Sequence, residues 1–152
     1  MIEKLINEEV VEVKVKVRNW EEAVRKSGEV LLRNNKIKEE YIDSMIGTVE
    51  KMGPYIVIAQ GVAMPHGRPE DGVLDLGISI ISLDSSVKFG NEDSDPVKLL
   101  IALCAKDSLE HIELLKDLSS ILEDEDIIEK IDLVNSKEDL INLILNKYRS
   151  YM

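Results

Sequence analysis

The feature that most constrains the fold is a run of apolar residues, 97–105, that only Lys98 interrupts. The run is far shorter than the roughly 20 residues that a membrane-spanning helix needs. An apolar segment of this kind is typical of a strand that is buried on both faces of its sheet. Because such sheets are covered by helices on both sides, the run predicts an α/β domain.

Three further strands are expected before this run. Residues 10–17 alternate apolar and charged side chains, which indicates a half-exposed edge strand. Residues 55–59 and 76–83 are two short apolar runs, and both have the composition of buried strands. A polar segment rich in glycine and proline separates these two runs.

Helical periodicity accounts for most of the remaining chain. Asn19 can cap a first helix that stops at Asn34 and Asn35, and Gly53-Pro54 ends a second one. The expected helices cover residues 19–35, 38–52, 108–122, 126–131 and 137–148. This order predicts a single domain over residues 1–152, an α/β fold whose mixed β-sheet is flanked by helices on both faces.

Composition excludes several classes of function. The 19 basic and 30 acidic residues give a net charge of −11, which has the wrong sign for binding nucleic acid. The single cysteine, Cys104, lies inside the apolar run and fits a small buried side chain in a reducing compartment. With no signal-like segment and no apolar run long enough to span a bilayer, we expect a cytoplasmic protein without direct membrane insertion.

The stretch with the most chemical information is residues 60–72, which leaves an expected strand and enters a loop. His66 lies there between Pro65 and Gly67, so the backbone around it is restrained and can approach a ligand closely. An imidazole whose tautomer is fixed by one ring nitrogen is nucleophilic through the other, as phosphohistidine chemistry requires. The alternative is an ordinary loop histidine that donates to a carbonyl.

The second histidine, His111, follows a helix-start signal. Asp107 can cap that helix and Glu110 can complete a box-like arrangement, which puts His111 in the first turn. The helix dipole favours an anion at this end. The alternative is a boundary histidine that is satisfied by a backbone carbonyl.

No pattern in the sequence calls for a cofactor or a metal ion. A glycine-rich phosphate loop with lysine is missing, and the two histidines do not have the spacing of a zinc helix motif. The acidic segment 91–95 lacks the glycine and the terminal glutamate of a calcium-binding loop, so we interpret it as a solvated turn.

Several segments taken together resemble the IIA component of the bacterial sugar phosphotransferase system (PTS), of the mannitol/fructose type. The resemblance covers nearly the whole chain, and the Gly53-Pro54-Tyr55 entry and the 65–70 loop are most similar to the ascorbate-type branch. The matching segments are residues 55–59, 63–70, 87–90 and 95–97 together with His111.

The resemblance implies a mannitol-type (PTS IIA type-2) fold and a phosphotransferase that works as a phosphoryl carrier. His66 would accept a phosphoryl group from HPr, which Enzyme I charges from phosphoenolpyruvate, and pass it to a cysteine of a IIB component. The group then reaches a sugar, with ascorbate as the family-level expectation, during uptake through a IIC membrane permease. His111 would stabilise the phosphoryl group, and Cys104 has no part in the scheme.

One residue of the family pattern is missing. Mannitol-type members carry an arginine in the helix before the active strand, where this chain has Thr48-Val49-Glu50-Lys51. Arg68, two residues after His66, is the candidate for supplying this positive charge, and the alternative is a solvated loop arginine.

Three other functions are alternatives to the carrier. A regulatory IIA-like protein of the nitrogen type would keep the chemistry of His66 but control partner proteins without transport. Histidine phosphatases place arginine directly before the histidine, where this chain has Pro65. An inert binding module, in which both histidines are structural, is the third alternative.

Overall fold

The computed structural model describes residues 2–122 and 126–150, and these form a mixed sheet with the strand order β1-β4-β5-β3-β2. This architecture confirms the predicted α/β fold with a mixed sheet and helices on both faces. The strands are β1 (Val11–Val15), β2 (Val57–Ala59), β3 (Val62–Ala63), β4 (Gly77–Val87) and β5 (Val97–Cys104).

Strand β5 lies at the centre of the sheet. It pairs antiparallel with β4 on one side and parallel with β3 on the other. All of its residues are buried except Lys98, which is half-buried. The nearly uninterrupted apolar run in the sequence is therefore explained by a strand that has neighbours on both edges and helices over both faces.

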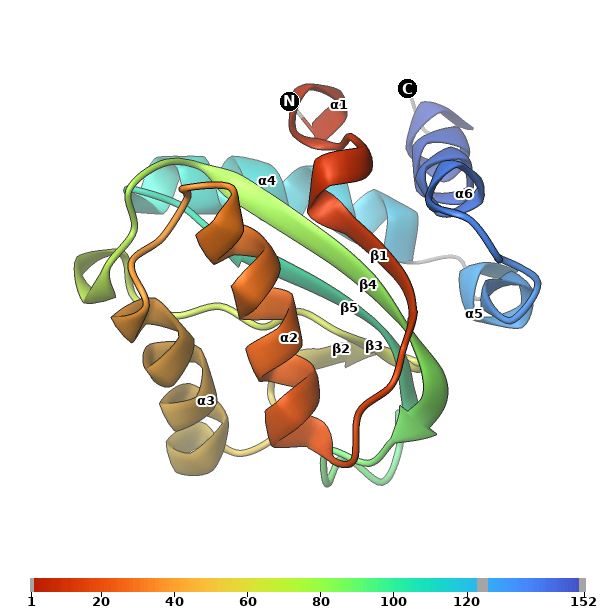
Figure 1. Ribbon diagram of the computed structural model, residues 1–152, viewed down its shortest axis with the longest axis horizontal. Coiled ribbons are helices and arrows are strands. Elements are labelled where there is room, and N and C mark those ends of the chain that lie inside the picture. Colours follow the sequence, from red (N-terminus) through yellow and green to blue (C-terminus); the bar gives the residue numbers. More distant parts are fainter. Residues whose placement is uncertain (1, 123–125, 151–152) are drawn as a thin grey trace.

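The helices form one layer on each side of the sheet (Figure 1). α2 (Trp20–Arg33) and α3 (Glu40–Met52) lie in front of the sheet in this view, and α4 (Ser108–Leu122) lies behind it. α6 (Lys137–Ser150) packs against α4 and β1, and α5 (Asp126–Ile131) contacts β5. Three short helical turns complete the described chain: α1 (Ile2–Leu5), η1 (Glu8–Val10) and η2 (Pro69–Asp71).

The helix boundaries follow the signals expected from the sequence. The Asn19 side chain accepts a hydrogen bond of 2.9 Å from the Glu22 amide and so caps α2. α3 ends where Gly53 takes a φ of +80°, a conformation that glycine adopts without steric cost. The predicted positions of the five helices are confirmed to within a few residues.

The region 55–63 differs from expectation. The strand predicted at residues 55–59 begins only at Val57, and the prediction that the segment is buried is right for Ile56 and Val57 but wrong for its other residues. Tyr55 is 77% exposed and Ile58 is 48% exposed. The reason is that β2 forms the sheet edge and pairs only with β3, a two-residue strand that the sequence pattern did not predict.

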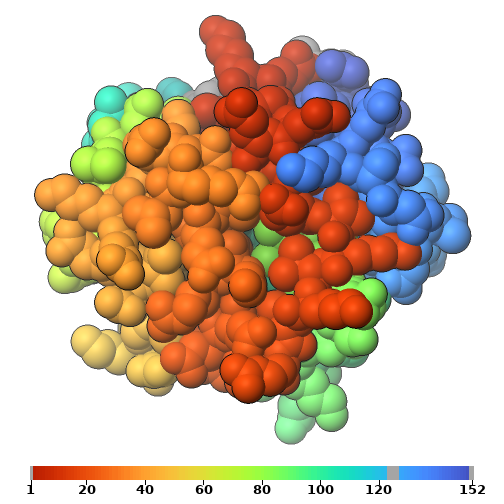
Figure 2. All heavy atoms as spheres, in the orientation of Figure 1, coloured from red at the N-terminus to blue at the C-terminus, as the bar shows by residue number. Residues whose placement is uncertain are grey.

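The amino-terminal strand is the other edge. β1 pairs with β4 alone, which confirms the predicted edge position. Figure 2 shows this first segment of the chain, in red, between the α2–α3 layer and residues of the last third, in blue. In the part of the chain that the structure describes, none of the helices has the length and apolarity that crossing a membrane would require.

Candidate active site

The candidate site lies at the carboxyl end of β5, where the chain that leaves β3 runs alongside it. β3 and β5 are in register, with Val62 opposite Leu99 and Ala63 opposite Leu100. The loop after β3 carries His66, and the loop after β5 leads into α4 and His111. In open α/β sheets the carboxyl ends of the strands are the usual place for ligands.

The fold brings the two histidines together, although they are far apart in sequence. Their ring centroids are 5.3 Å apart and the ring planes are inclined by 50°. Both rings border one cleft of about 360 Å³. The cleft is also lined by Arg68, by Asp107 and Ser108 at the start of α4, and by the apolar side chain of Ile112.

The tautomer of His66 is defined by its surroundings. Nδ1 lies 2.8 Å from the main-chain oxygen of Met64. A carbonyl oxygen can only accept, so Nδ1 must carry the proton in this contact. The lone pair that can act as a nucleophile is consequently on Nε2, the nitrogen on the other side of the ring.

Backbone hydrogen bonds hold the loop on both sides of His66. The Leu103 amide donates to the Pro65 oxygen at 3.0 Å. The Gly67 amide donates to the hydroxyl of Tyr41 at 2.8 Å, and that hydroxyl donates to the Leu103 oxygen at 2.9 Å. Burial raises the pKa of Tyr41, which keeps the phenol protonated and able to donate.

Tyr41 is a functional candidate that the sequence analysis missed. It lies in the second expected helix, residues 38–52, and had no predicted role in the site. A usable signal existed, because a tyrosine on an otherwise apolar helical stripe must find a hydrogen-bond partner when it is buried. Tyr41 is 1% exposed.

His111 occupies the first turn of α4, as the capping signal predicted. The Asp107 side chain accepts from the Glu110 amide at 2.9 Å, and Glu110 accepts from the Lys106 amide at 3.0 Å. Burial, followed by repulsion from His66, lowers the pKa of His111. His111 therefore stays neutral at a pH where an exposed histidine would already be partly charged.

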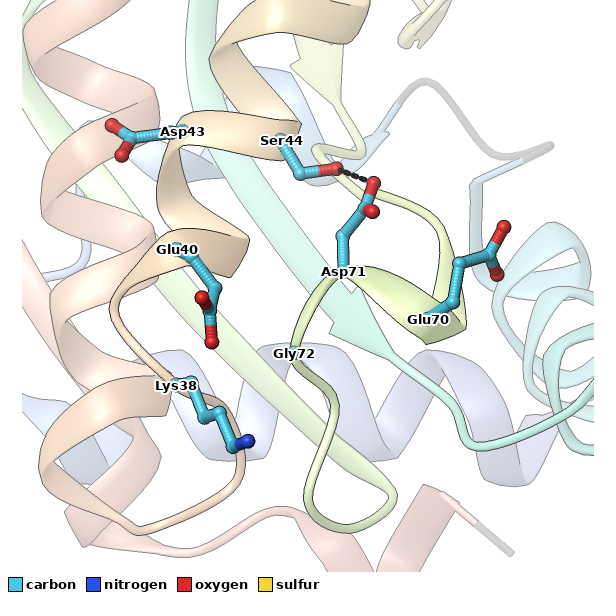
Figure 3. Close-up of a pocket in the computed structure, with 7 residues that line it drawn as sticks. All are labelled: Lys38, Glu40, Asp43, Ser44, Glu70, Asp71 and Gly72. Carbon is cyan, nitrogen blue, oxygen red and sulfur yellow. Dashed lines mark hydrogen bonds between the residues drawn. The ribbon is translucent and has the colours of Figure 1, made fainter.

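Arg68 borders the cleft, but its guanidinium group is already paired. Nε and Nη2 donate to Asp71 at 3.1 and 3.3 Å, and Glu70 lies 3.6 Å away. Asp71 also accepts from Ser44 of α3 at 2.7 Å, and Figure 3 shows these two side chains facing each other. The hydrogen bond from Arg68 is the main reason that the pKa of Asp71 is lowered.

The resemblance to the mannitol-type family places an arginine in the second expected helix, at residues 48–51. Thr48 and Lys51 lie in the second half of α3, where they border a hollow together with Arg68 and Asp71. The Thr48 hydroxyl is turned back to the Ser44 oxygen at 2.9 Å. Arg68 thus approaches, from the loop, the region where the family pattern has its helical arginine.

Cys104 is buried at the end of β5, as predicted. Its thiol donates to the Asp75 oxygen at 3.3 Å. Burial raises the pKa of the thiol to about 12, so the reactive thiolate does not form near neutral pH. Among residues 2–122 and 126–150, no group of three or more His, Cys, Asp and Glu side chains is arranged to hold a metal ion.

The chain is similar to known proteins over nearly its whole length. A relative from Escherichia coli K12, described as the ascorbate-specific PTS system EIIA component, is 32% identical over 143 residues, which are 93% of both chains. The solved structure of the mannitol-specific cryptic phosphotransferase enzyme IIA CmtB from E. coli is 36% identical, with a TM-score of 0.82. That match covers 95% of this chain and 97% of the other.

A second solved structure contains a partner protein. It is the complex of enzyme IIAMTL with phosphorylated enzyme IIBMTL from E. coli. It is 29% identical, has a TM-score of 0.81 and covers 93% of this chain and 97% of that one. Residues 4–147 match the family model of the phosphoenolpyruvate-dependent sugar phosphotransferase system, EIIA 2. This chain therefore belongs to the EIIA 2 family of that phosphotransferase system.

Proposed function

We propose that this chain, with residues 1–152 acting as one domain, is a cytoplasmic phosphoryl carrier that uses His66. His66 accepts the phosphoryl group of phosphorylated HPr and passes it to a cysteine of a IIB component. The observation that carries this proposal is the contact of 2.8 Å between His66 Nδ1 and the Met64 oxygen. This contact keeps the proton on Nδ1 and leaves the lone pair on Nε2 free to attack phosphorus.

The transfer consists of two in-line displacements at phosphorus. The Nε2 lone pair of His66 forms a bond to phosphorus while the bond between phosphorus and the donor nitrogen of HPr breaks, and its electron pair stays on that nitrogen. In the second step the IIB thiolate attacks phosphorus, and the bond to Nε2 breaks in turn. Nδ1 keeps its proton and its contact with Met64 throughout, so positioning supplies most of the catalysis.

Two neighbours are proposed to stabilise the transferred group. A phosphoryl group on Nε2 would enter the cleft that His111 and Arg68 also line. His111 can donate a hydrogen bond to it, and the amino-terminal end of α4 favours its negative charge. Arg68 can add a charge-assisted bond if it gives up part of its pairing with Asp71.

The surface next to the cleft is suited to a protein partner. Leu109 and Ile112, on the first turns of α4, are 67% and 61% exposed. Exposed apolar side chains gathered beside a reactive group are typical of a contact site for another protein. The solved complex with phosphorylated IIB supports a IIB component as the acceptor, and the ascorbate-specific relative supports an ascorbate-type system as the setting. A IIC permease as the sugar transporter of that system is part of the proposal.

Reconstitution tests the carrier directly. The wild-type chain and His66→Ala are each incubated with phosphoenolpyruvate, Enzyme I and HPr. The mass of each of the two chains is then measured by mass spectrometry. The wild type should gain one acid-labile phosphoryl group and His66→Ala none. A wild-type chain that gains no mass overturns the proposal.

Adding a IIB component separates transport from regulation. The carrier reading predicts that phospho-His66 loses its phosphoryl group to wild-type IIB and keeps it when the IIB cysteine is replaced by serine. A chain that is phosphorylated but never discharged by IIB proteins would instead fit the regulatory alternative.

A further inference from the structure

The pairing of β3 with β5 continues beyond the end of β3. Val62 is opposite Leu99 and Ala63 is opposite Leu100. The same register, carried three residues further, places His66 opposite Leu103. In a parallel ladder the amide of Leu103 would then donate to Pro65, and the carbonyl of Leu103 would accept from Gly67.

Only the first of these two ladder bonds is direct. The Leu103 amide donates to the Pro65 oxygen at 3.0 Å. In place of the second bond, the Tyr41 hydroxyl stands between the two groups. It accepts from the Gly67 amide at 2.8 Å and donates to the Leu103 oxygen at 2.9 Å. A single side-chain oxygen therefore keeps the strands apart at the residue that follows His66.

The loop is packed tightly against the helix that provides this hydroxyl. A Cβ atom added to Gly67 would lie 2.6 Å from the Ser44 hydroxyl oxygen and 3.2 Å from ring atom Cε1 of Tyr41. Tyr41 and Ser44 are one turn apart on α3, so one face of α3 contacts the loop at both places. Tyr41 itself is almost completely buried, which leaves little room for water to replace the hydroxyl.

We propose that Tyr41 is a positioning residue for phosphoryl transfer, which spaces the His66 loop from β5 through its hydroxyl. The inference rests on the proposed role of His66. Without the hydroxyl, the Gly67 amide and the Leu103 carbonyl would either stay unpaired or close into a direct ladder bond. Direct closure would pull the chain at Gly67 toward β5 and move the His66 ring away from its place in the cleft. A displacement of about 1 Å at a reacting group can lower the rate up to a hundredfold.

The test compares Tyr41→Phe with Ser79→Ala. The first variant removes the hydroxyl and keeps the ring. The second also deletes one buried hydroxyl that donates to a main-chain oxygen, that of Ser27 at 2.9 Å, but on β4 and away from the loop. Each protein is assayed for its rate of phosphorylation by phosphorylated HPr, for its final extent of phosphorylation, and for its thermal stability.

For Tyr41→Phe we expect kcat to fall by about tenfold or more, while KM for HPr stays within about twofold and the final extent remains one group per chain. Ser79→Ala should transfer at nearly the wild-type rate at temperatures well below its unfolding transition. A Tyr41→Phe rate equal to that of the wild type, or lowered only as much as that of Ser79→Ala, overturns the inference.

A second readout does not depend on any phosphoryl donor. Nitrogen-15 NMR reports which ring nitrogen of His66 carries the proton. We expect a predominantly Nδ1-protonated ring in the wild type and in Ser79→Ala, and a shifted tautomer balance in Tyr41→Phe. An unchanged spectrum in Tyr41→Phe contradicts the positioning role, whereas a wild type that HPr never phosphorylates defeats only the carrier function.

Discussion

The two histidines of the cleft are held in opposite ways. His66 lies in a loop whose backbone is bonded on both sides, to Leu103 and to Tyr41, and its Nδ1 is bonded to Met64. The main chain of His111 is fixed by the first turn of α4, where its amide donates to Asp107. No hydrogen bond to the ring of His111 is found from residues 2–122 or 126–150.

This difference matches the two chemical tasks that we propose for these residues. A nucleophile benefits from one tautomer and one position, because both the attacking atom and its direction must be defined. A group that stabilises a charge benefits from a proton that it can gain when the charge arrives. The lowered pKa of His111 leaves this residue neutral before transfer, ready to respond to an anion in the cleft.

The largest effect on the transfer rate is expected from disturbing the loop that holds His66. In Gly67→Ala the new Cβ would lie 2.6 Å from the Ser44 hydroxyl oxygen and 3.2 Å from Cε1 of Tyr41, so the contact between the loop and α3 must rearrange and the transfer rate should fall by about a hundredfold. The matched control is Gly47→Ala on α3, whose Cβ meets nothing within 4 Å. The control should transfer normally and gain about 0.5–1 kcal/mol in its free energy of unfolding.

Both variants are compared by rapid-quench transfer kinetics and by urea unfolding. If Gly67→Ala transferred as fast as Gly47→Ala, the loop would not need its present position.

A smaller effect on the transfer rate is expected from replacing His111. His111→Ala should still accept one phosphoryl group on His66, but transfer should slow by about tenfold, because one charge-assisted hydrogen bond to the phosphoryl group is lost. Ser119→Ala, on an exposed part of the same helix, is the control. Stopped-flow or quench measurements give both rates, and equal rates would remove His111 from the mechanism.

Replacing Arg68 should change the rate less. The side chain is exposed and its guanidinium group is ion-paired with Asp71. Arg68→Gln should therefore slow transfer by only about threefold. Arg68→Lys keeps the charge but loses the two-pronged geometry, and we expect an intermediate rate. The same kinetic assay decides the matter, since a wild-type rate in Arg68→Gln would make Arg68 a solvated loop residue.

The smallest effect concerns stability. Because the folded protein lowers the pKa of His111, the unfolded chain binds more protons once the pH falls below the ordinary histidine value of 6.5. The contribution of His111 to the free energy of unfolding is thus complete above that pH and is lost progressively as the pH falls toward the folded-state pKa.

Urea unfolding of the wild type and His111→Ala, at about pH 7.5 and about pH 5.5, measures this contribution. Acidification should destabilise the wild type more than the variant. A difference between the two proteins that does not change with pH would show that the surroundings of His111 do not oppose its charge.

Much of the fold could be predicted because its signals are local. Asn19 and Asp107 cap their helices as expected, and the run at residues 97–105 forms the central strand. The errors are at residues 55–63, where β2 and β3 have only three and two residues, which is too short for a pattern of alternation. There, exposure depends on which strand lies next in the sheet, and periodicity does not contain that information.

The two histidines of the candidate site could be singled out from the sequence, but the residues that hold them in place could not. His66 is marked by its proline and glycine neighbours, and His111 is marked by a capping signal. Tyr41 is not marked in this way, because the hydrogen-bond partners of its hydroxyl are distant in the sequence. Gly67 is 26 residues away and Leu103 is 62 residues away. The hydrogen bond from Ser44 to Asp71, which also accepts from Arg68, likewise depends on how η2 packs against α3.

The central claim is that the phosphoryl group is carried by Nε2 of His66, and NMR can test it in one experiment. The chain, labelled with nitrogen-15 in its histidine rings, is phosphorylated by Enzyme I and HPr, and phosphorus–nitrogen couplings are recorded. The account predicts a coupling to Nε2 of His66 alone, with Nδ1 still protonated. A coupling to Nδ1 of His66, or to either nitrogen of His111, would contradict it.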